Sequence, residues 1–475
     1  MESLYDEELI ELIVKNNKTH TTGKAKDIIP YTANTASKLS GNFNLTLGSY
    51  ARFLTNVKID KKQIESLDSL ESYSDEFNDL SIFTTLTFKQ FESKDASEDM
   101  KNSLMKIIDS FLFVDHNLSP VHPFLFNFIN YDKSEYDRFG KFLADVLGSE
   151  TILESRFNDR EADHILIKLI IQQLSALLKS KPESKKENNE FQNMLPFLSE
   201  LYRQDIEFLQ KDSERFNSDF GLLTHFYSFM YLSQLVFKFD QFENADYSKA
   251  DEFYFVLDWE KVSERRLAIT SSHSFKTIND RAKNFFAHSH ALAHLSHNSL
   301  QANKDERYKI YNYQELHSLV SEKGEEFEQD FINKLNTWLT AYSSWQGNES
   351  LSEQLPDQLS EQFRLLKQML VSNMANTVQS KTEAGLRNIG KGSFLKSRGR
   401  YGNVLNLKHD LLILLTSVIV KEERMLLKEV IQELGKRGIC FDQNSKRELI
   451  EMYKLHNMLD KKSDSGDAQY VKRIL

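Results

Sequence analysis

The sequence predicts a mainly α-helical, multi-domain protein that ends in a winged helix-turn-helix. The 475 residues contain only 6 prolines and 16 glycines, and this composition favours long helices with few tight turns. A chain of this length is too long for one ordinary hydrophobic core, so we expect several domains. Near the C-terminus, two short apolar strips flank a Ser/Asp/Gly turn, which is typical of a β-hairpin.

Residues 1–180 form the first expected domain, which is mainly helical. Its clearest helix is expected over 160–179, because apolar side chains recur there on one face. That stripe consists of Leu166, Leu169, Ile170, Leu174, Leu177 and Leu178. The polar, charge-rich segment at 180–190 follows, and we interpret it as a linker.

Residues 191–380 form the second expected domain, which is also helical. Residues 222–239 predict a helix that is apolar nearly all round and rich in Phe and Tyr, so we expect it at the centre of the core. Further helices are expected at 276–300 and 323–343. The segment 253–257, Phe-Tyr-Phe-Val-Leu, is compatible with a strand or a helix, and the sequence does not decide between them.

Residues 385–475 form the third expected domain. Its predicted elements are a strand at 404–407, helices at 408–420, 422–436 and 445–455, and a hairpin made by 458–460 and 468–471. The turn RGICFD precedes the last helix, and Asp442 or Asn444 is expected to cap that helix. Strand, helix, helix, turn, helix and hairpin follow one another in the winged-helix order.

The net charge changes sign along the chain. Residues 381–475 contain 19 Lys and Arg against 12 Asp and Glu, a net charge of +7, whereas the whole chain carries −10. A basic module on an acidic body predicts contact with double-stranded DNA at the C-terminal domain, because phosphate neutralisation supplies most non-specific affinity. The alternative is a basic face that docks an acidic partner protein without contacting DNA.

The candidate DNA-contacting residues follow from the way a winged helix binds. Its third helix normally enters the major groove with its first residues at the base edges. The wing and the flanking arms are then available for contact with the DNA backbone. The candidates are, in the arm before the first strand, Lys396, Arg398, Arg400 and Tyr401; at the start of the third helix, Asn444, Ser445, Lys446 and Arg447; in the wing, Lys461 and Lys462; and in the tail, Lys472.

Sequence motifs that support catalysis are not found. GLRNIGKG at 385–392 nearly matches a phosphate-binding loop, but a helix precedes it and glycine follows the lysine, so we interpret it as a flexible hinge. Asp258-Trp259-Glu260-Lys261 has the residue types of a nuclease centre at the wrong spacing, and we expect an exposed turn there. We therefore expect no catalytic residue and no cofactor.

Four histidines within ten residues leave a metal-dependent enzyme as an alternative. His290 and His294 are one helical turn apart, and His297 lies on the same face one turn further. Three imidazoles on one side of a helix can bind zinc or another divalent ion. No carboxylate is interleaved between His288 and His297, so we favour histidines of an interface helix and expect no metal.

The chain is expected to be cytoplasmic. Its single cysteine, Cys440, excludes a disulfide framework and a Cys-rich zinc site. The most apolar run, 411–420, is about half the length that spans a bilayer, so we expect no membrane contact.

A family resemblance covers roughly the last 85 residues. The segments FLKSRGRYGNVLNL, RGICFD and KKSDSGDAQYVK are similar to the terminal region of the DptG (DndG) family, the G component of bacterial DNA phosphorothioation-dependent restriction systems. The resemblance implies a non-catalytic, DNA-contacting or scaffolding subunit of an anti-phage restriction assembly. It also implies two partners, a DptF-like protein and a DptH-like ATPase, which act with it against DNA that lacks the host's sulfur modification.

Overall fold

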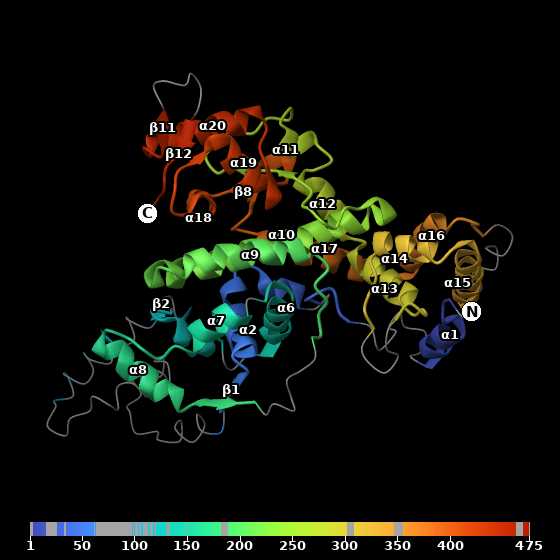
Figure 1. Ribbon diagram of the computed structural model, residues 1–475, viewed down its shortest axis with the longest axis horizontal. Helices are drawn as coiled ribbons and strands as arrows, with labels where there is room; N and C mark the ends of the chain where they lie inside the picture. The colour runs from blue at the N-terminus through green and yellow to red at the C-terminus, as the bar shows by residue number, and fades with distance from the viewer. Residues whose placement is uncertain are drawn as a thin grey trace. The chain divides into compact units, whose positions relative to one another are not determined.

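The protein is mostly helical in the computed structural model, as the sequence predicts (Figure 1). The structure describes residues 3–15, 26–32, 35–60, 120–130, 134–148, 150–181, 189–301, 308–345, 355–461 and 469–474, with isolated positions between 61 and 119. In this described part of the chain, none of the helices has both the length and the apolar character needed to cross a bilayer.

The chain divides into two compact units. Unit 1 holds residues 1–41, 189–202 and 223–475, and unit 2 holds residues 42–188 and 203–222. Helices α9 (Pro196–Leu209) and α10 (Ser213–Phe239) contribute residues to both units. The division into three domains, with boundaries near 180–190 and 380–385, stays a prediction.

Unit 2 is built around helix α2. Its described elements include α2 (Thr46–Leu54), β1 (Val57–Ile59), the 3-10 helix η4 (Pro123–Phe128), α6 (Asp137–Leu147), α7 (Glu150–Asn158), α8 (Ile165–Ser175) and β4 (Leu178–Ser180). Helix α2 packs against α6, α7 and η4. The helix expected over 160–179 is shorter than predicted, because Leu178 pairs with Ile59 as strand β4 joins β1.

Unit 1 contains most of the remaining helices. They include α1 (Asp6–Lys15), α12 (Phe275–Ala282), α13 (Phe285–Leu295), α14 (Tyr313–Glu322), α15 (Glu325–Trp345), α16 (Leu359–Asn373) and α17 (Asn376–Gly390). Residues 223–239 of α10 are all buried, so the predicted central position of this helix is confirmed. The helix expected at 276–300 is two helices, α12 and α13, separated by a short break.

Two of the three glycines of the expected hinge, Gly385 and Gly390, lie inside helix α17. The prediction of a break at 385–392 is wrong for its first part, because α17 continues to Gly390. A Cβ on Gly385 would lie 2.4 Å from the Tyr31 ring, and a Cβ on Gly390 would lie 2.6 Å from the Phe229 ring. These glycines therefore permit close packing of the helix against aromatic side chains.

The C-terminal part of unit 1 alternates short strands with helices. Its elements are β7 (Leu395–Ser397), β8 (Asn403–Leu407), α18 (His409–Val420), β9 (Met425–Leu426), α19 (Leu427–Lys436), β10 (Ile439–Cys440), α20 (Gln443–Leu455), β11 (Leu459–Lys461) and β12 (Gln469–Val471). Strands β11, β12 and β9 form one antiparallel sheet in that order. The helix expected from 422 begins at Leu427, because Met425 and Leu426 pair with β12.

The undecided segment 253–257 forms two short strands. Strand β5 (Phe253–Tyr254) pairs in parallel with β10, and β6 (Val256–Leu257) pairs in parallel with β8. Strand β8 also pairs with β7, so β6, β8 and β7 make a three-stranded sheet. The C-terminal elements are therefore joined by backbone hydrogen bonds to a segment about 150 residues earlier in the chain.

Candidate functional site

Helix α20 begins at a capped end. Of the two residues expected to cap it, Asp442 does so: its Oδ1 accepts hydrogen bonds from the backbone N–H groups of Asn444 and Ser445, each at 3.0 Å. These donors have no partner within the helix, and the carboxylate satisfies them. The cap fixes where the first residues of α20 lie.

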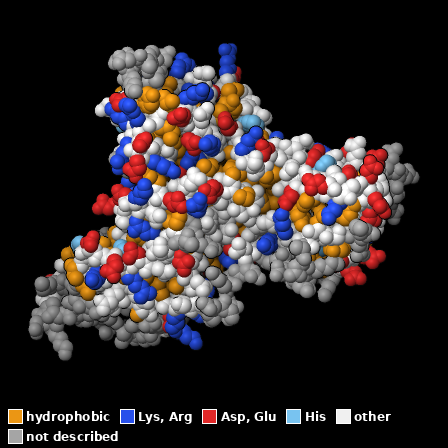
Figure 2. All heavy atoms as spheres, viewed as in Figure 1, with side chains coloured by type: hydrophobic (Ala, Val, Ile, Leu, Met, Phe, Trp, Pro, Cys, Tyr) orange, Lys and Arg blue, Asp and Glu red, His pale blue; other side chains and the backbone are white. Residues whose placement is uncertain are grey.

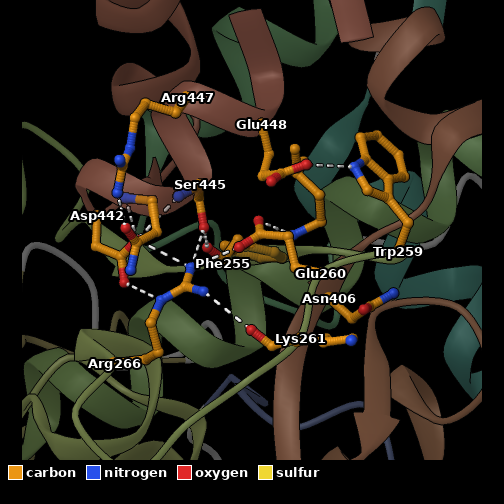
Figure 3. Close-up of polar contacts among 12 residues, drawn as sticks. Phe255, Trp259, Glu260, Lys261, Arg266, Asn406, Asp442, Ser445, Arg447 and Glu448 are labelled. Carbon is orange, nitrogen blue, oxygen red and sulfur yellow. Dashed lines mark hydrogen bonds and ion pairs between the residues drawn. The ribbon is translucent and has the colours of Figure 1, made fainter. Parts of the chain in front are cut away.

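A buried arginine holds the capping carboxylate from the other side (Figure 3). Arg266 donates from Nε to Asp442 Oδ2 at 2.6 Å and from Nη2 to Asp442 Oδ1 at 2.9 Å. The same Nη2 lies 2.6 Å from Glu260 Oε2 and 2.7 Å from Ser445 Oγ. One guanidinium therefore joins the segment 260–266 to the start of α20.

The charges of this cluster stabilise one another. Burial alone would raise the pKa of Asp442, but hydrogen bonds from Arg266 and from the Ser445 N–H lower it below its ordinary value. Burial likewise opposes the charge of Arg266, while its bonds to Asp442 and Glu260 raise its pKa. Asp442 and Arg266 are therefore held in their charged forms, and the guanidinium bonds Asp442, Glu260 and Ser445 of the same chain.

The turn at 258–261 is shaped by Glu260. Its Oε2 bonds Arg266, and its Oε1 accepts from the backbone N–H of Leu257 at 2.8 Å. A turn was expected here, but the expectation that it is exposed is wrong for Glu260, which is 5% exposed. The carboxylate is buried because it has both a cation and a backbone donor as partners.

The next side chain in the turn, Trp259, faces outward. Its Nε1–H donates to Glu448 Oε2 on α20 at 3.2 Å (Figure 3). Its ring meets the His409 ring edge-on at 6.4 Å between centroids. The side chain nevertheless stays 42% exposed. The hydrogen bond sets the orientation of the indole and leaves part of its surface accessible.

Two of the arm residues predicted to contact DNA brace this turn. Lys396 Nζ lies 2.9 Å from both the backbone oxygen and Oδ1 of Asp258. Arg398 donates to the backbone oxygen of Glu260 at 3.0 Å and to Asn406 Oδ1 at 3.2 Å. These bonds form because β8, which carries Asn406, pairs with β6 directly before the turn.

The other two arm residues form a more exposed group. Arg400 Nη2 donates to the Tyr401 hydroxyl at 2.8 Å and forms an ion pair with Glu264 at 3.2 Å. The Arg400 and Glu264 side chains are 73% and 69% exposed, and such surface pairs contribute little to stability. Arg400 can therefore exchange this partner for another anion.

The predicted residues at the start of α20 differ in accessibility. Ser445 is fully buried against Arg266, whereas Asn444 and Arg447 are exposed and hydrogen-bond to each other. Lys446 is half-buried. Accordingly, Asn444 and Arg447 are the members of this group that present side chains outward.

The wing and tail residues are described only in part. Lys472 Nζ lies 3.2 Å from Asn457 Oδ1 and 3.6 Å from Asp460 Oδ1. Strand β11 ends at Lys461, whose side chain lies outside the described residues, as does all of Lys462.

An open cavity of about 560 Å³ lies at this junction. The 258–261 turn lines it with Trp259, Glu260 and Lys261, α20 lines it with Asn444, Arg447 and Glu448, and Arg266 completes the wall. The cavity thus combines an exposed indole with cationic, anionic and amide side chains.

Basic and acidic side chains are interspersed on the protein surface. On the face that Figure 2 shows, Lys and Arg lie among Asp and Glu and do not gather into one patch. In the C-terminal part, Arg473 pairs with Glu422 at 3.4 Å, and Lys454 pairs with Glu451 at 2.6 Å. Some of the basic side chains of residues 381–475 are therefore paired with carboxylates of the same region.

Three of the four clustered histidines, His288, His294 and His297, contact aromatic side chains of the core. His288 Nδ1 lies 3.1 Å from the Tyr313 hydroxyl, and burial lowers its pKa well below the ordinary value. The His294 ring meets Trp338 edge-on at 5.4 Å between centroids. Across the described ranges, no group of three or more His, Cys, Asp and Glu side chains is placed to hold a metal ion.

Arg266 was not predicted from the sequence, and the turn at 258–261 beside it was expected to have no function. Only a Trp set among charged residues, directly after the apolar run 253–257, distinguishes the turn in the sequence. Nothing local distinguishes Arg266, because its partner Asp442 lies 176 positions away.

Comparison with known proteins assigns no family. The chain matches no protein-family model and no curated protein.

Proposed function

We propose that this chain is a non-catalytic, DNA-contacting and scaffolding subunit of a phosphorothioation-dependent restriction complex. The observation that carries the proposal is the start of α20, where Asp442 and Arg266 fix the helix while Asn444 and Arg447 stay exposed. Amide and guanidinium groups held on a rigid helix end are suited to hydrogen-bond base edges and phosphates.

We further propose that the C-terminal part adopts a winged helix. The order α18, β9, α19, α20, β11 and β12 supports this, because it is the order of helices and wing strands in that fold. The antiparallel sheet β11-β12-β9 also supports it, since a wing is a hairpin that pairs with the strand after the first helix. In this arrangement α20 is the recognition helix.

The assignment to a restriction system rests on the resemblance of the C-terminal sequence to the DptG (DndG) family. On that basis the proposed partners are double-stranded DNA, a DptF-like subunit and a DptH-like ATPase, and the proposed location is the cytoplasm. Of the predicted contact residues, Arg400, Asn444, Lys446 and Arg447 are those we propose to meet DNA. Lys396, Arg398 and Ser445 instead support the site, because their polar groups bond within the chain.

A mobility-shift titration of duplex DNA against the full chain at several salt concentrations tests this. The double variant Lys446→Glu/Arg447→Glu should bind more weakly. The slope of its log binding constant against log salt concentration should become shallower by roughly one for each lost phosphate contact. Lys323→Glu, on an exposed residue at the end of α14, is the control. Equal affinity and slope in the double variant and the control would refute DNA contact at α20.

A protein-docking adaptor is the second candidate function. Leu455, in the last turn of α20, is 84% exposed, and a large apolar side chain in that position suits contact with a protein. This candidate predicts no retention of DNA at low salt together with stable co-purification with an ATPase subunit. Loss of that co-purification in Leu455→Ser would support it.

A further inference from the structure

Hydrogen bonds within the chain fix the shape of the cavity beside α20. Glu260 and Arg266 on its wall are bonded to each other at 2.6 Å, and the turn above it is bonded to Lys396 and Arg398. Its volume of about 560 Å³ falls within the usual size of a small-ligand pocket, on the order of 300–1,000 Å³. A site that is already ordered loses little entropy on binding.

Trp259 offers the cavity an aromatic surface. The indole N–H is bonded to Glu448, so a ligand in the cavity would contact the face of the ring. Flat aromatic groups such as nucleobases stack on such rings whatever their identity. Within a duplex both faces of a base are covered by neighbouring bases, so only an unpaired base can stack in this way.

Two exposed cations also line the cavity. Lys261 is exposed, and in the described part of the chain its ammonium has no ion-pair partner. Arg447 is bonded to a neutral amide, that of Asn444. Of the two carboxylates that line the cavity, Glu260 is paired with Arg266, and Glu448 accepts the Trp259 indole N–H. Each of the two cations can bind a phosphate at the rim of the cavity.

We propose that this cavity binds one unpaired nucleotide of DNA, with the base stacked on Trp259 and the phosphates on either side of it held by Lys261 and Arg447. The inference rests on the proposed DNA contact and adds a substrate class to it. The favoured substrate is DNA with an unpaired or displaced nucleotide, in preference to an uninterrupted duplex.

Fluorescence anisotropy of labelled DNA with the full chain tests the inference. The probes are a duplex, the same duplex with one unpaired central cytidine, and the single strand. We expect the unpaired cytidine to strengthen binding by roughly tenfold, the order of one base stacked on an aromatic ring. Trp259→Ala should remove this gain, Trp259→Phe should keep part of it, and Lys261→Gln should reduce it.

The matched control is Trp345→Ala, which removes a half-buried tryptophan of α15 and should leave the gain intact. If the duplex binds and the unpaired cytidine adds nothing, the inference is overturned while the proposed DNA contact stands. A gain that persists in Trp259→Ala also overturns it. If the single strand binds through Trp259 while the duplex does not bind, the cavity assignment holds and the proposed duplex contact fails.

Discussion

Arg266 and Asp442 lie 176 positions apart in the chain and are joined by two hydrogen bonds, at 2.6 and 2.9 Å. The arginine reaches Asp442 from the segment that follows β6, and Asp442 caps α20. The pair therefore connects the strand segment 253–257 to the helix that carries the proposed DNA contacts. It also fixes the start of α20 through bonds within the chain.

Replacing Arg266 by alanine should destabilise unit 1. The change leaves the Glu260 and Asp442 carboxylates buried without a cation, which typically costs about 3–5 kcal/mol. Urea unfolding followed by circular dichroism measures the loss. Arg266→Lys should recover only part of it, because an ammonium cannot reproduce the planar fork of donors.

The adjacent Arg265 is exposed and provides the control for this change. Arg265→Ala should shift the free energy of unfolding by no more than about 0.5 kcal/mol, as surface substitutions usually do. Similar losses in the two alanine variants would show that Arg266 does not hold the cluster together.

Gly438→Ala should also destabilise the protein, because Gly438 lies close to side chains of α10. Gly438 has φ +85°, and a Cβ there would lie 2.6 Å from Met230 Cε and 2.9 Å from Gln234 Nε2 on α10. Gly392 is a matched control, since its φ is +80° and a Cβ there would meet nothing within 4 Å. Both variants lose about 1 kcal/mol to the left-handed backbone, and Gly438→Ala should lose more than Gly392→Ala, because Met230 Cε and the Gln234 amide, which bonds the Asp251 backbone oxygen, must shift. Equal shifts in thermal midpoint would contradict the contact with α10.

The stability of the protein should fall below neutral pH because of His225. Its Nε2–H donates to the backbone oxygen of Ile389 at 2.7 Å, and burial lowers its pKa to about 4. The unfolded chain, with an ordinary histidine pKa of about 6.5, binds the proton first as the pH falls. The contribution of neutral His225 to the free energy of unfolding is therefore complete above pH ~6.5 and is lost as the pH falls toward 4.

Between pH 7 and pH 5 this residue should account for about 2 kcal/mol of lost stability. His225→Gln removes the titrating group and keeps a donor that can reach Ile389. The difference in unfolding free energy between wild type and His225→Gln should thus shrink at pH 5. A constant difference across this range would mean that His225 is protonated, or neutral, in both the folded and unfolded states.

The C-terminal elements illustrate which features of the fold follow from local pattern. The apolar stripes predict α18, α19 and α20, and the strips around the Ser/Asp/Gly turn predict β11 and β12. The predicted start of α19 differs from the observed one by several residues, because β9 forms only when Met425 and Leu426 pair with β12. Strand pairing of this kind depends on a distant partner and has no local signal.

For the candidate site, residue type indicated which side chains are cationic and tertiary contacts determined which of them are accessible. Lys396, Arg398 and Arg447 look equivalent in the sequence, yet the first two bond the 258–261 turn and the third is exposed. Trp259 was assigned to an exposed turn, and its hydrogen bond to Glu448 depends on α20 lying opposite.

By itself the sequence determined the helical class, the buried course of α10 and the positions of most C-terminal helices, since these follow from the spacing of apolar residues over a few turns. Only the tertiary structure decided that 253–257 is β-strand, that Arg266 holds the cap of α20, and that a cavity forms beside Trp259. These features require groups far apart in the chain to meet, and their energies arise from burial and hydrogen bonding that exist only after the chain has folded.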